Sequence, residues 1–262
     1  MTEAIFELKG VVAKYGELRA LDDVSFRIEK GDVVGVVGPN GGGKTTLLNV
    51  MLGNLPIVAG SVKVFGRNIR EFKEWHRIGY VAQHAIQFDP IFPATVEEIV
   101  SLGCLSRKHI GKRLSAEDKE EVKRALELVD LLPQRNRRIG QLSGGQKQRI
   151  FIAKALVKRP EVLILDEATA GLDICIQDRF IDLIRRMKAE RDITVVTVSH
   201  DLSGVLCQAN KLAVVNKKVY WQEIDEKSNP EIALRQAYGE HFTFVFHSHH
   251  HCEQPPIKIK EG

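Results

Sequence analysis

Residues 38–45 read Gly-Pro-Asn-Gly-Gly-Gly-Lys-Thr, and they follow the apolar run Val-Val-Gly-Val-Val at 33–37. That run is short and continuous, as expected of a buried strand, and residues 44–52 have a helical pattern. Glycines let main-chain N–H groups surround phosphate oxygens, and the start of the next helix presents its positive end to them. The spacing and the strand-to-helix context match a phosphate-binding loop, which predicts a nucleotide-binding α/β fold.

The loop residues have separate predicted roles. We expect Lys44 to neutralise the β- and γ-phosphates and the Thr45 hydroxyl to ligate Mg²⁺. The predicted nucleotide-binding residues of this segment are Gly38, Pro39, Asn40, Gly41, Gly42, Gly43, Lys44, Thr45 and Thr46.

An acidic pair, Asp166-Glu167, follows a second apolar run at 162–165. At the end of a buried strand, Asp166 can hold Mg²⁺ through water. Glu167 is the candidate general base for the attacking water. Adjacent acids at a strand end are often only a solvated turn, but the phosphate-binding loop upstream favours the catalytic interpretation.

Residues 142–146 read Leu-Ser-Gly-Gly-Gln and precede a helical run at 147–158. Ser143 is a suitable helix cap, and Gly144 and Gly145 leave amide donors accessible, so this is a second helix start suited to an anion. A simple cap is the alternative. A single nucleotide site has no need of two phosphate cradles, so a second molecule is the expected user of this one.

The three motifs, in this order, resemble one family, the ATPase domains of the ATP-binding cassette proteins. The resemblance covers residues 4–225 and implies a RecA-like P-loop core with an antiparallel β subdomain and an inserted helical subdomain. It implies ATP hydrolysis by a head-to-tail dimer. In that dimer Ser143, Gly144, Gly145 and Gln146 of one copy complete the site of the other.

The same resemblance assigns residues that are weak signals alone. Gln83 matches the glutamine that senses Mg²⁺ and the attacking water, His200 the histidine that contacts the γ-phosphate, and Tyr15 the aromatic that stacks on adenine. The expected catalytic residues are Glu167, His200, Gln83 and Lys44, and the expected Mg²⁺ residues are Thr45, Gln83 and Asp166.

One further segment extends the resemblance, and two single positions depart from it. Gly171-Leu172-Asp173 matches the loop that crosses the dimer interface. Ala82 and Ala168 stand where the family commonly has proline. Neither change removes a catalytic group, so we expect an effect on loop rigidity and ATPase rate.

The pattern of the whole chain predicts its organisation. Runs typical of strands occur at 5–8, 11–15, 24–28, 61–65 and 78–81, and strands alternate with helices after 162, which indicates a mostly parallel sheet covered by helices. A helix is predicted at 115–132, capped by Ser115 with Asp118 three residues later. The predicted domains are 1–83 with 157–240 (ATP-binding core and β subdomain), 84–156 (helical subdomain) and 241–262 (His-rich tail).

Segment 76–103 is similar to the ATPase subunits of zinc, manganese and iron importers. The resemblance implies that the surface after Gln83 receives a helix from a membrane subunit. The apolar Ile91-Phe92-Pro93 either forms that docking surface or packs internally. The implied partners are a second copy, integral membrane permease subunits and a substrate-binding protein.

The tail contains five of the nine histidines, followed by Cys252. Imidazole and thiolate are suitable ligands for Zn²⁺. The candidate zinc ligands are His247, His249, His250, His251 and Cys252, with His241 nearby. A regulatory role and incidental chelation are both open.

Bulk properties set further bounds. The net charge of +4 is too small to argue for a nucleic-acid partner. No window approaches the ~20 apolar residues of a spanning helix, and the amino terminus does not resemble a secretion signal. The four cysteines stand singly, which favours free thiols in a reducing cytosol. The expected location is the cytoplasmic side of the cell membrane, bound peripherally to other chains.

Together these features predict the ATP-hydrolysing subunit of a divalent-metal importer, with zinc ahead of manganese and iron. Two alternatives are a single-cassette soluble ATPase in an assembly role and a transporter subunit for another solute. Co-purification with an integral membrane protein would separate the assembly factor from the transporters.

Overall fold

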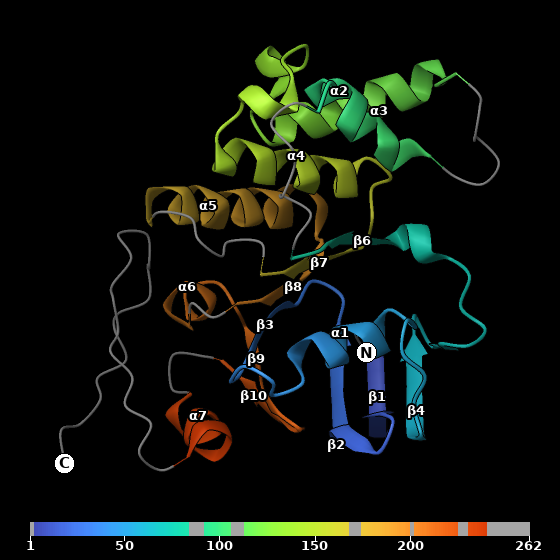
Figure 1. The fold of residues 1–262 in the computed structure, drawn as a ribbon, viewed down its shortest axis with the longest axis vertical. Helices are drawn as coiled ribbons and strands as arrows, with labels where there is room; N and C mark the ends of the chain where they lie inside the picture. Colours follow the sequence, from blue (N-terminus) through green and yellow to red (C-terminus); the bar gives the residue numbers. More distant parts are fainter. Residues whose placement is uncertain are drawn as a thin grey trace. The chain divides into compact units, whose positions relative to one another are not determined.

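The computed structural model describes residues 3–83, 92–105, 113–167, 174–199, 202–224 and 230–239, with only the main chain at 174–180 and 191 (Figure 1). The chain forms two compact units. The first contains Met1–Lys73 and Thr194–Gly262, and the second contains Glu74–Ile193. These limits differ from the domain limits expected from the motifs, which stay a prediction.

The first unit contains an antiparallel sheet in the order β2 (Leu18–Glu29), β1 (Ala4–Tyr15), β4 (Ala59–Val64) and β5 (Arg67–Asn68). Two strands were predicted where β1 runs as one. The pairing of β1 with β2 shifts register between Leu8 and Val11, and Gly10 there has a positive φ of 59°. Such a bulge interrupts the alternation of the sequence without ending the strand.

Strand β3 (Val33–Val37) lies between two parallel partners in the same unit, β9 (Lys211–Asn216) and β8 (Thr194–Val198). All of its residues are buried, as the continuous apolar run predicts for a strand covered on both faces. Helix α1 (Lys44–Met51) follows it. Strand β10 (Lys218–Glu223) pairs antiparallel with β9.

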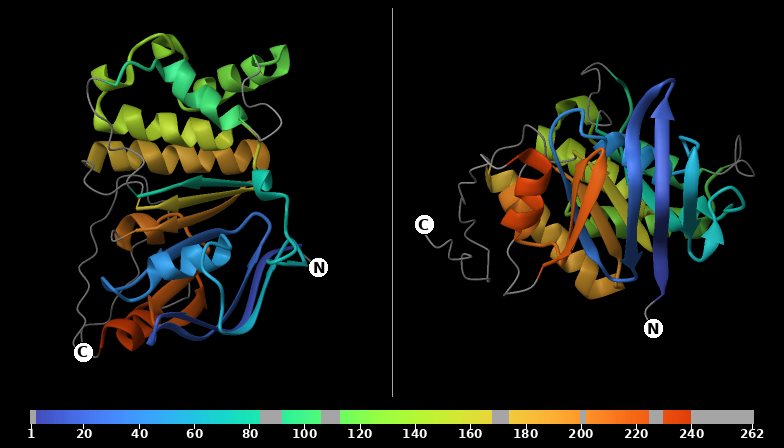
Figure 2. Two further views of the ribbon diagram at one scale, coloured as in Figure 1. Left: turned by 45° about the vertical axis from the view of Figure 1, so that its right-hand side comes forward. Right: turned by 90° about the horizontal axis from the view of Figure 1, so that it is seen from below.

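Two short helices complete the first unit, α6 (Leu202–Leu206) and α7 (Glu231–Tyr238). Helix α7 lies beside β9 and β10 (Figure 2). The sequence pattern predicted neither α7 nor β10. Only three of the eight α7 residues are buried and β10 is only half-buried, so neither has a strong apolar pattern.

In the second unit, β6 (Ile78–Val81) pairs parallel with the fully buried β7 (Val162–Asp166). Arg77 and Glu161, which precede the two strands, form a two-pronged ion pair whose Nη2 and Oε2 atoms are 3.0 Å apart. This pair joins the strands at their amino ends. Their carboxyl ends carry the acidic pair and Gln83.

The helices of the second unit are α2 (Val96–Ser101), α3 (Ala116–Leu128), α4 (Gly144–Leu156) and α5 (Ile174–Arg191). Helices α2, α3 and α4 pack together (Figure 1). Helix α3 ends before the predicted residue 132, because Asp130 has a left-handed main chain with φ of 56°. Short 3₁₀ helices lie at Trp75–Arg77, Leu102–Cys104, Leu132–Gln134 and Ile139–Gln141.

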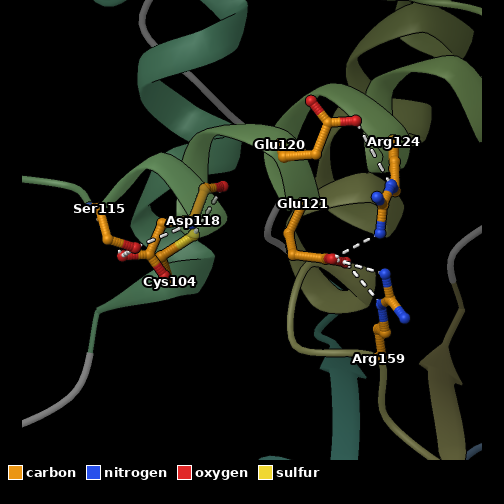
Figure 3. A network of polar contacts seen from close by, with 7 residues as sticks. All are labelled: Cys104, Ser115, Asp118, Glu120, Glu121, Arg124 and Arg159. Atoms are coloured by element: carbon orange, nitrogen blue, oxygen red, sulfur yellow. Dashed lines mark hydrogen bonds and ion pairs between the residues drawn. The ribbon is translucent and has the colours of Figure 1, made fainter.

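Polar contacts hold α3 in place (Figure 3). Ser115 caps the helix and forms a reciprocal capping box with Asp118, which confirms the predicted start. Glu121 pairs with Arg159, which follows α4. Ion pairs as exposed as this one contribute only ~0–1 kcal/mol to the free energy of unfolding. The main effect of the pair is therefore to orient α3 against the chain that follows α4.

Cys104 and Cys207 differ in their bonding. Cys104 is a buried free thiol, and burial raises its pKa to about 11, so it is protonated at neutral pH. Cys207 is disulfide-bonded, and the expectation of free thiols is wrong for this residue. Among the described helices, none is both long and apolar enough to cross a membrane.

Candidate nucleotide-binding site

The loop between β3 and α1 is a compact turn. Gly38 has a φ of 151°, and a Cβ built on it would stand 2.1 Å from the carbonyl oxygen of Val215. Gly43 is the N-cap of α1 with a φ of 105°, and its Cβ would stand 2.8 Å from the carbonyl oxygen of Ala20. Only glycine tolerates these positions, so the conformation of the turn depends on both.

Lys44 is the first residue of α1 and is 6% exposed. Its ammonium group donates to the carbonyl oxygens of Gly38, at 2.9 Å, and Pro39, at 3.1 Å. A buried ammonium at the start of a helix strengthens the attraction for an anion that the helix end already provides. The loop therefore fits a phosphate group.

The other expected ligands of the first unit are accessible. Thr45 is exposed, whereas Thr46 is buried in α1. Tyr15 lies at the end of β1 and is 50% exposed, so its ring is free of the core and is available to a planar base.

Asp166 ends β7 in the second unit and is 3% exposed. The Tyr80 hydroxyl donates a hydrogen bond of 3.2 Å to its Oδ2 atom. Burial, and then the Asp166 carboxylate, raises the pKa of Tyr80 to about 12, so the hydroxyl remains a donor at neutral pH. The Asp166 carboxylate and the Thr45 hydroxyl are hard oxygen ligands of the kind that Mg²⁺ takes.

Tyr80 was not among the residues expected at the site. Strand register explains its place: Tyr80 pairs with Ile164, and Asp166 is two residues further along the neighbouring strand on the same face. The alternation within β6 was visible in the sequence, but the pairing of β6 with β7 was not.

Glu167 follows Asp166 with a left-handed main chain, φ 48°. Such a conformation costs a non-glycine residue of order 1–3 kcal/mol and is concentrated at functional sites. The side-chain amide of Gln83 donates a hydrogen bond to the Glu167 carboxylate. Because β6 and β7 end in register, with Val81 opposite Leu165, these two expected catalytic residues are neighbours.

Ser143 is the N-cap of α4, as predicted. Its Oγ accepts from the Gln146 N–H at 3.3 Å, and the Gln146 side chain accepts from the Ser143 N–H at 3.1 Å. Because the hydroxyl oxygen serves as the acceptor, the hydroxyl proton is available to another group. Ser143 and Gly144 are exposed, and the first turn of α4 contains no acidic residue to repel an anion.

Several expected residues lie outside the described residues: His200, Ala168, the segment 171–173, Ile91, and the tail residues His241, His247, His249, His250, His251 and Cys252. Within the described ranges, no group of three or more His, Cys, Asp or Glu side chains is arranged to hold a metal ion. The predicted zinc site of the tail therefore stays a prediction.

Comparison with known proteins supports the arrangement of motifs. The family model for the ABC transporter matches residues 21–170, more than half of the chain. The zinc uptake system ATP-binding protein ZurA of Listeria innocua is 41% identical, over 82% of this chain and 84% of that protein. The manganese transport system ATP-binding protein MntB of Listeria monocytogenes is 34% identical, over 89% of this chain and 96% of that protein.

A solved structure provides a likeness in three dimensions. It is the dimeric structure of a post-hydrolysis state of an ATP-binding cassette bound to ADP and Pi. The match has a TM-score of 0.69 and 26% identity, and covers 84% of this chain and 99% of that one. The predicted fold class, a P-loop α/β core with an antiparallel β sheet and a helical part, is confirmed. The chain belongs to the ABC transporter family and is an ATPase.

Proposed function

We propose that this ATPase energises the import of a divalent metal ion, foremost zinc, through separate membrane subunits. The observation that carries the proposal is the similarity over most of the chain to a zinc uptake ATP-binding protein, with a manganese counterpart at lower identity. The segment at 76–103, by which the sequence resembles metal importers, supports the same substrate class.

Hydrolysis is assigned to residues of the phosphate-binding loop, of the acidic pair and of the smaller motifs around them. Lys44 neutralises charge on the β- and γ-phosphates, and Tyr15 stacks on the adenine. Glu167 accepts a proton from the attacking water, which Gln83 orients, and His200 contacts the γ-phosphate. Thr45, Gln83 and Asp166 are the residues that would hold Mg²⁺, which would supply positive charge to the phosphate oxygens.

A second copy of the chain is the proposed partner for the signature segment at 142–146. The start of α4 is exposed, has no acidic residue in its first turn and keeps a hydroxyl proton to donate. These features suit a phosphate brought by another molecule. We place Ser143, Gly144, Gly145 and Gln146 against the γ-phosphate bound to the partner copy.

The membrane subunits are the proposed partners for the region before α2. Phe92 is 43% exposed and Pro93 is also exposed, immediately before the Thr95 capping box of α2. An exposed aromatic residue fits an apolar helix of a permease better than internal packing. This assigns the chain a peripheral place on the cytoplasmic face of the membrane, with a substrate-binding protein delivering the metal.

The proposal is tested by metal uptake in cells that lack this chain. We expect the wild-type chain to restore accumulation of radioactive zinc, and Glu167→Gln to fail because loss of a general base slows hydrolysis by about 10²–10⁴-fold. The parallel assays use manganese and iron. Restored uptake of only manganese or iron changes the cargo, and restored uptake of none contradicts the metal assignment.

Purification of the tagged chain from the same membranes separates the remaining alternatives. Recovery with an integral membrane protein but without metal-dependent uptake indicates a transporter for another solute. Recovery without any integral membrane protein favours a soluble assembly ATPase.

A further inference from the structure

The turn between β9 and β10 contacts the phosphate-binding loop through its main chain. The turn is a single residue, Lys217, because Asn216 ends β9, Lys218 begins β10 and these two residues pair with each other. Lys217 has a left-handed main chain with a φ of 57°, which is uncommon for a residue other than glycine. Its contacts with the rest of the unit are therefore examined first for the main chain, since the residue itself is exposed.

Both main-chain polar groups of Lys217 are hydrogen-bonded. Its N–H donates to the carbonyl oxygen of Gly42, in the phosphate-binding loop, at 2.7 Å. Its carbonyl oxygen accepts from the N–H of Asp22, in β2, also at 2.7 Å. The neighbouring strands β10 and β2 contact each other through the stacked rings of Trp221 and Phe26, whose centroids are 4.9 Å apart. One residue thus joins the loop to the antiparallel sheet.

The end of β9 is also packed closely against the loop. A Cβ built on Gly38 would stand 2.1 Å from the carbonyl oxygen of Val215, and one built on Gly42 would stand 2.6 Å from the same oxygen. Glycine at both positions lets the main chain of the loop approach the main chain of β9. The Lys217 hydrogen bond is therefore made where the two segments are already in contact.

The bond to Gly42 determines the direction of the next amide. The peptide unit between Gly42 and Gly43 is trans, so its carbonyl and N–H groups point in opposite directions. Because the carbonyl group is held by Lys217, the Gly43 N–H points away from the turn. Gly43 is the N-cap of α1, and the amides at a helix start are the groups that bind a phosphate.

We propose that Lys217 is a positioning residue for the phosphate-binding loop, whose amides it orients through the Gly42 carbonyl. This inference rests on the proposed assignment of residues 38–45 to nucleotide binding. Lys217 acts through Gly42 and does not touch the reacting atoms. Loss of its left-handed conformation should weaken the binding of every ligand that carries the phosphates, and leave the rate at saturation nearly unchanged.

The test is Lys217→Val in the full chain, because a β-branched residue is strongly disfavoured in the left-handed region. Affinity is measured by equilibrium binding of fluorescent ADP and by its displacement with ATP and with pyrophosphate, which has no base. KM, kcat and the melting temperature without nucleotide are measured alongside. We expect Kd to rise about threefold to tenfold for all three ligands and KM to rise with it, the size of one lost hydrogen bond.

Two variants control for the side chain and for stability. Lys217→Gly removes the ammonium group but keeps the left-handed turn and its N–H, so we expect it to retain wild-type affinity. Asp192→Val places the same residue at another exposed left-handed position, with a φ of 48°, outside the loop. It should lower the melting temperature about as much as Lys217→Val does, without changing the affinity for nucleotide.

A measurement on the wild-type chain needs no variant to fold. Hydrogen exchange of the Lys217 amide, followed by NMR, should slow further when ADP binds, because a loop held by its ligand also holds the Gly42 carbonyl. Rapid exchange that ADP does not change would contradict the proposal.

Unchanged affinity in Lys217→Val overturns the proposal. Equal losses of affinity in Lys217→Val and Lys217→Gly would assign the effect to the ammonium group, and an equal loss in Asp192→Val would assign it to general stability. Weaker binding of ADP and ATP with unchanged binding of pyrophosphate would also contradict it. If the wild-type chain binds none of the three ligands, the assignment of the loop fails instead, so the two failures are distinguishable.

Discussion

The starts of helices α1 and α4 are both glycine-rich and both assigned to phosphate, yet they are built differently. Helix α1 begins at Gly43, which has a left-handed main chain and no side-chain cap, and its first residue is the buried Lys44. Helix α4 has Ser143 as its N-cap, which closes a reciprocal capping box with Gln146, and Ser143 and Gly144 are exposed whereas Gly145 is buried.

The difference agrees with the proposal that the start of α1 binds the chain's own nucleotide and that the start of α4 faces another molecule. At α1 the turn encloses the Lys44 ammonium group, which places a cation beside the helix start in the proposed phosphate site. At α4 the cap already satisfies orphan amides, and the start of the helix contributes donors without a buried cation. The start of α1 has the features expected of a nucleotide site within one chain. The start of α4 has those expected of a surface that contacts a nucleotide on another chain.

The largest expected effect is at the first helix start. Lys44→Ala removes the buried cation, and we expect ATP hydrolysis to fall by about 10²–10³-fold, as for loss of one main electrostatic contact. Lys147→Ala is the matched control, since Lys147 lies near the start of α4. Steady-state ATPase assays on both variants decide the comparison. Equal losses would show that the two helix starts do not differ in the proposed way.

The next largest effect is expected at the start of α4 and concerns dimerisation. It is measured in the Glu167→Gln variant, which is expected to retain bound ATP. Ser143→Ala should reduce ATP-dependent dimerisation by about 1.5–3 kcal/mol, the range for a hydrogen bond to a charged group. Size-exclusion chromatography with saturating ATP and Mg²⁺ measures the dimer, and fluorescent ATP measures binding to the monomer, which should be unchanged.

Ser115→Ala is the control for the dimerisation experiment, because Ser115 closes an equivalent capping box on α3. Loss of either cap costs about 0.5–2 kcal/mol of stability, but only Ser143→Ala should affect the dimer. A Glu167→Gln chain that stays monomeric with saturating ATP would contradict the proposed site shared between copies.

The glycines provide a third comparison. Gly43→Ala forces a positive φ and a close contact with Ala20, and we expect a loss of about 1–3 kcal/mol in the free energy of unfolding. Gly144 lies within the first turn of α4 and is exposed, so Gly144→Ala should leave the monomer as stable or stabilise it by up to ~1 kcal/mol. Urea denaturation measures both variants, and equal destabilisation would contradict the contrast in main-chain geometry.

The smallest expected effect concerns the tail. A chain ending at Gly239 keeps α7 and every proposed residue of the nucleotide site, so we expect basal ATP hydrolysis and nucleotide affinity to match the full chain. Zinc binding, measured by titration with metal analysis, should be lost if the histidines and Cys252 bind it. A loss of basal activity would assign the tail a structural role, and zinc binding without change in rate would make it a passive chelator.

Local patterns predicted much of the fold. The apolar run at 33–37 and the loop after it identified a buried strand and a helix start, because both depend on neighbouring residues. The caps Ser115 and Ser143 were predicted for the same reason. Helix α7 and strand β10 were missed because their stability depends on packing against β9 rather than on a strong pattern of their own.

The spacing of glycines, Lys44, the acidic pair and the signature segment along the chain was sufficient to identify the chemistry and the family. The place of Tyr80 beside Asp166 followed from the register of two strands, and the place of Asn216 beside Ala237 from packing of α7. Register and packing join residues that are distant in the sequence. They arise from burial of apolar surface over the whole unit, which no short stretch of sequence contains.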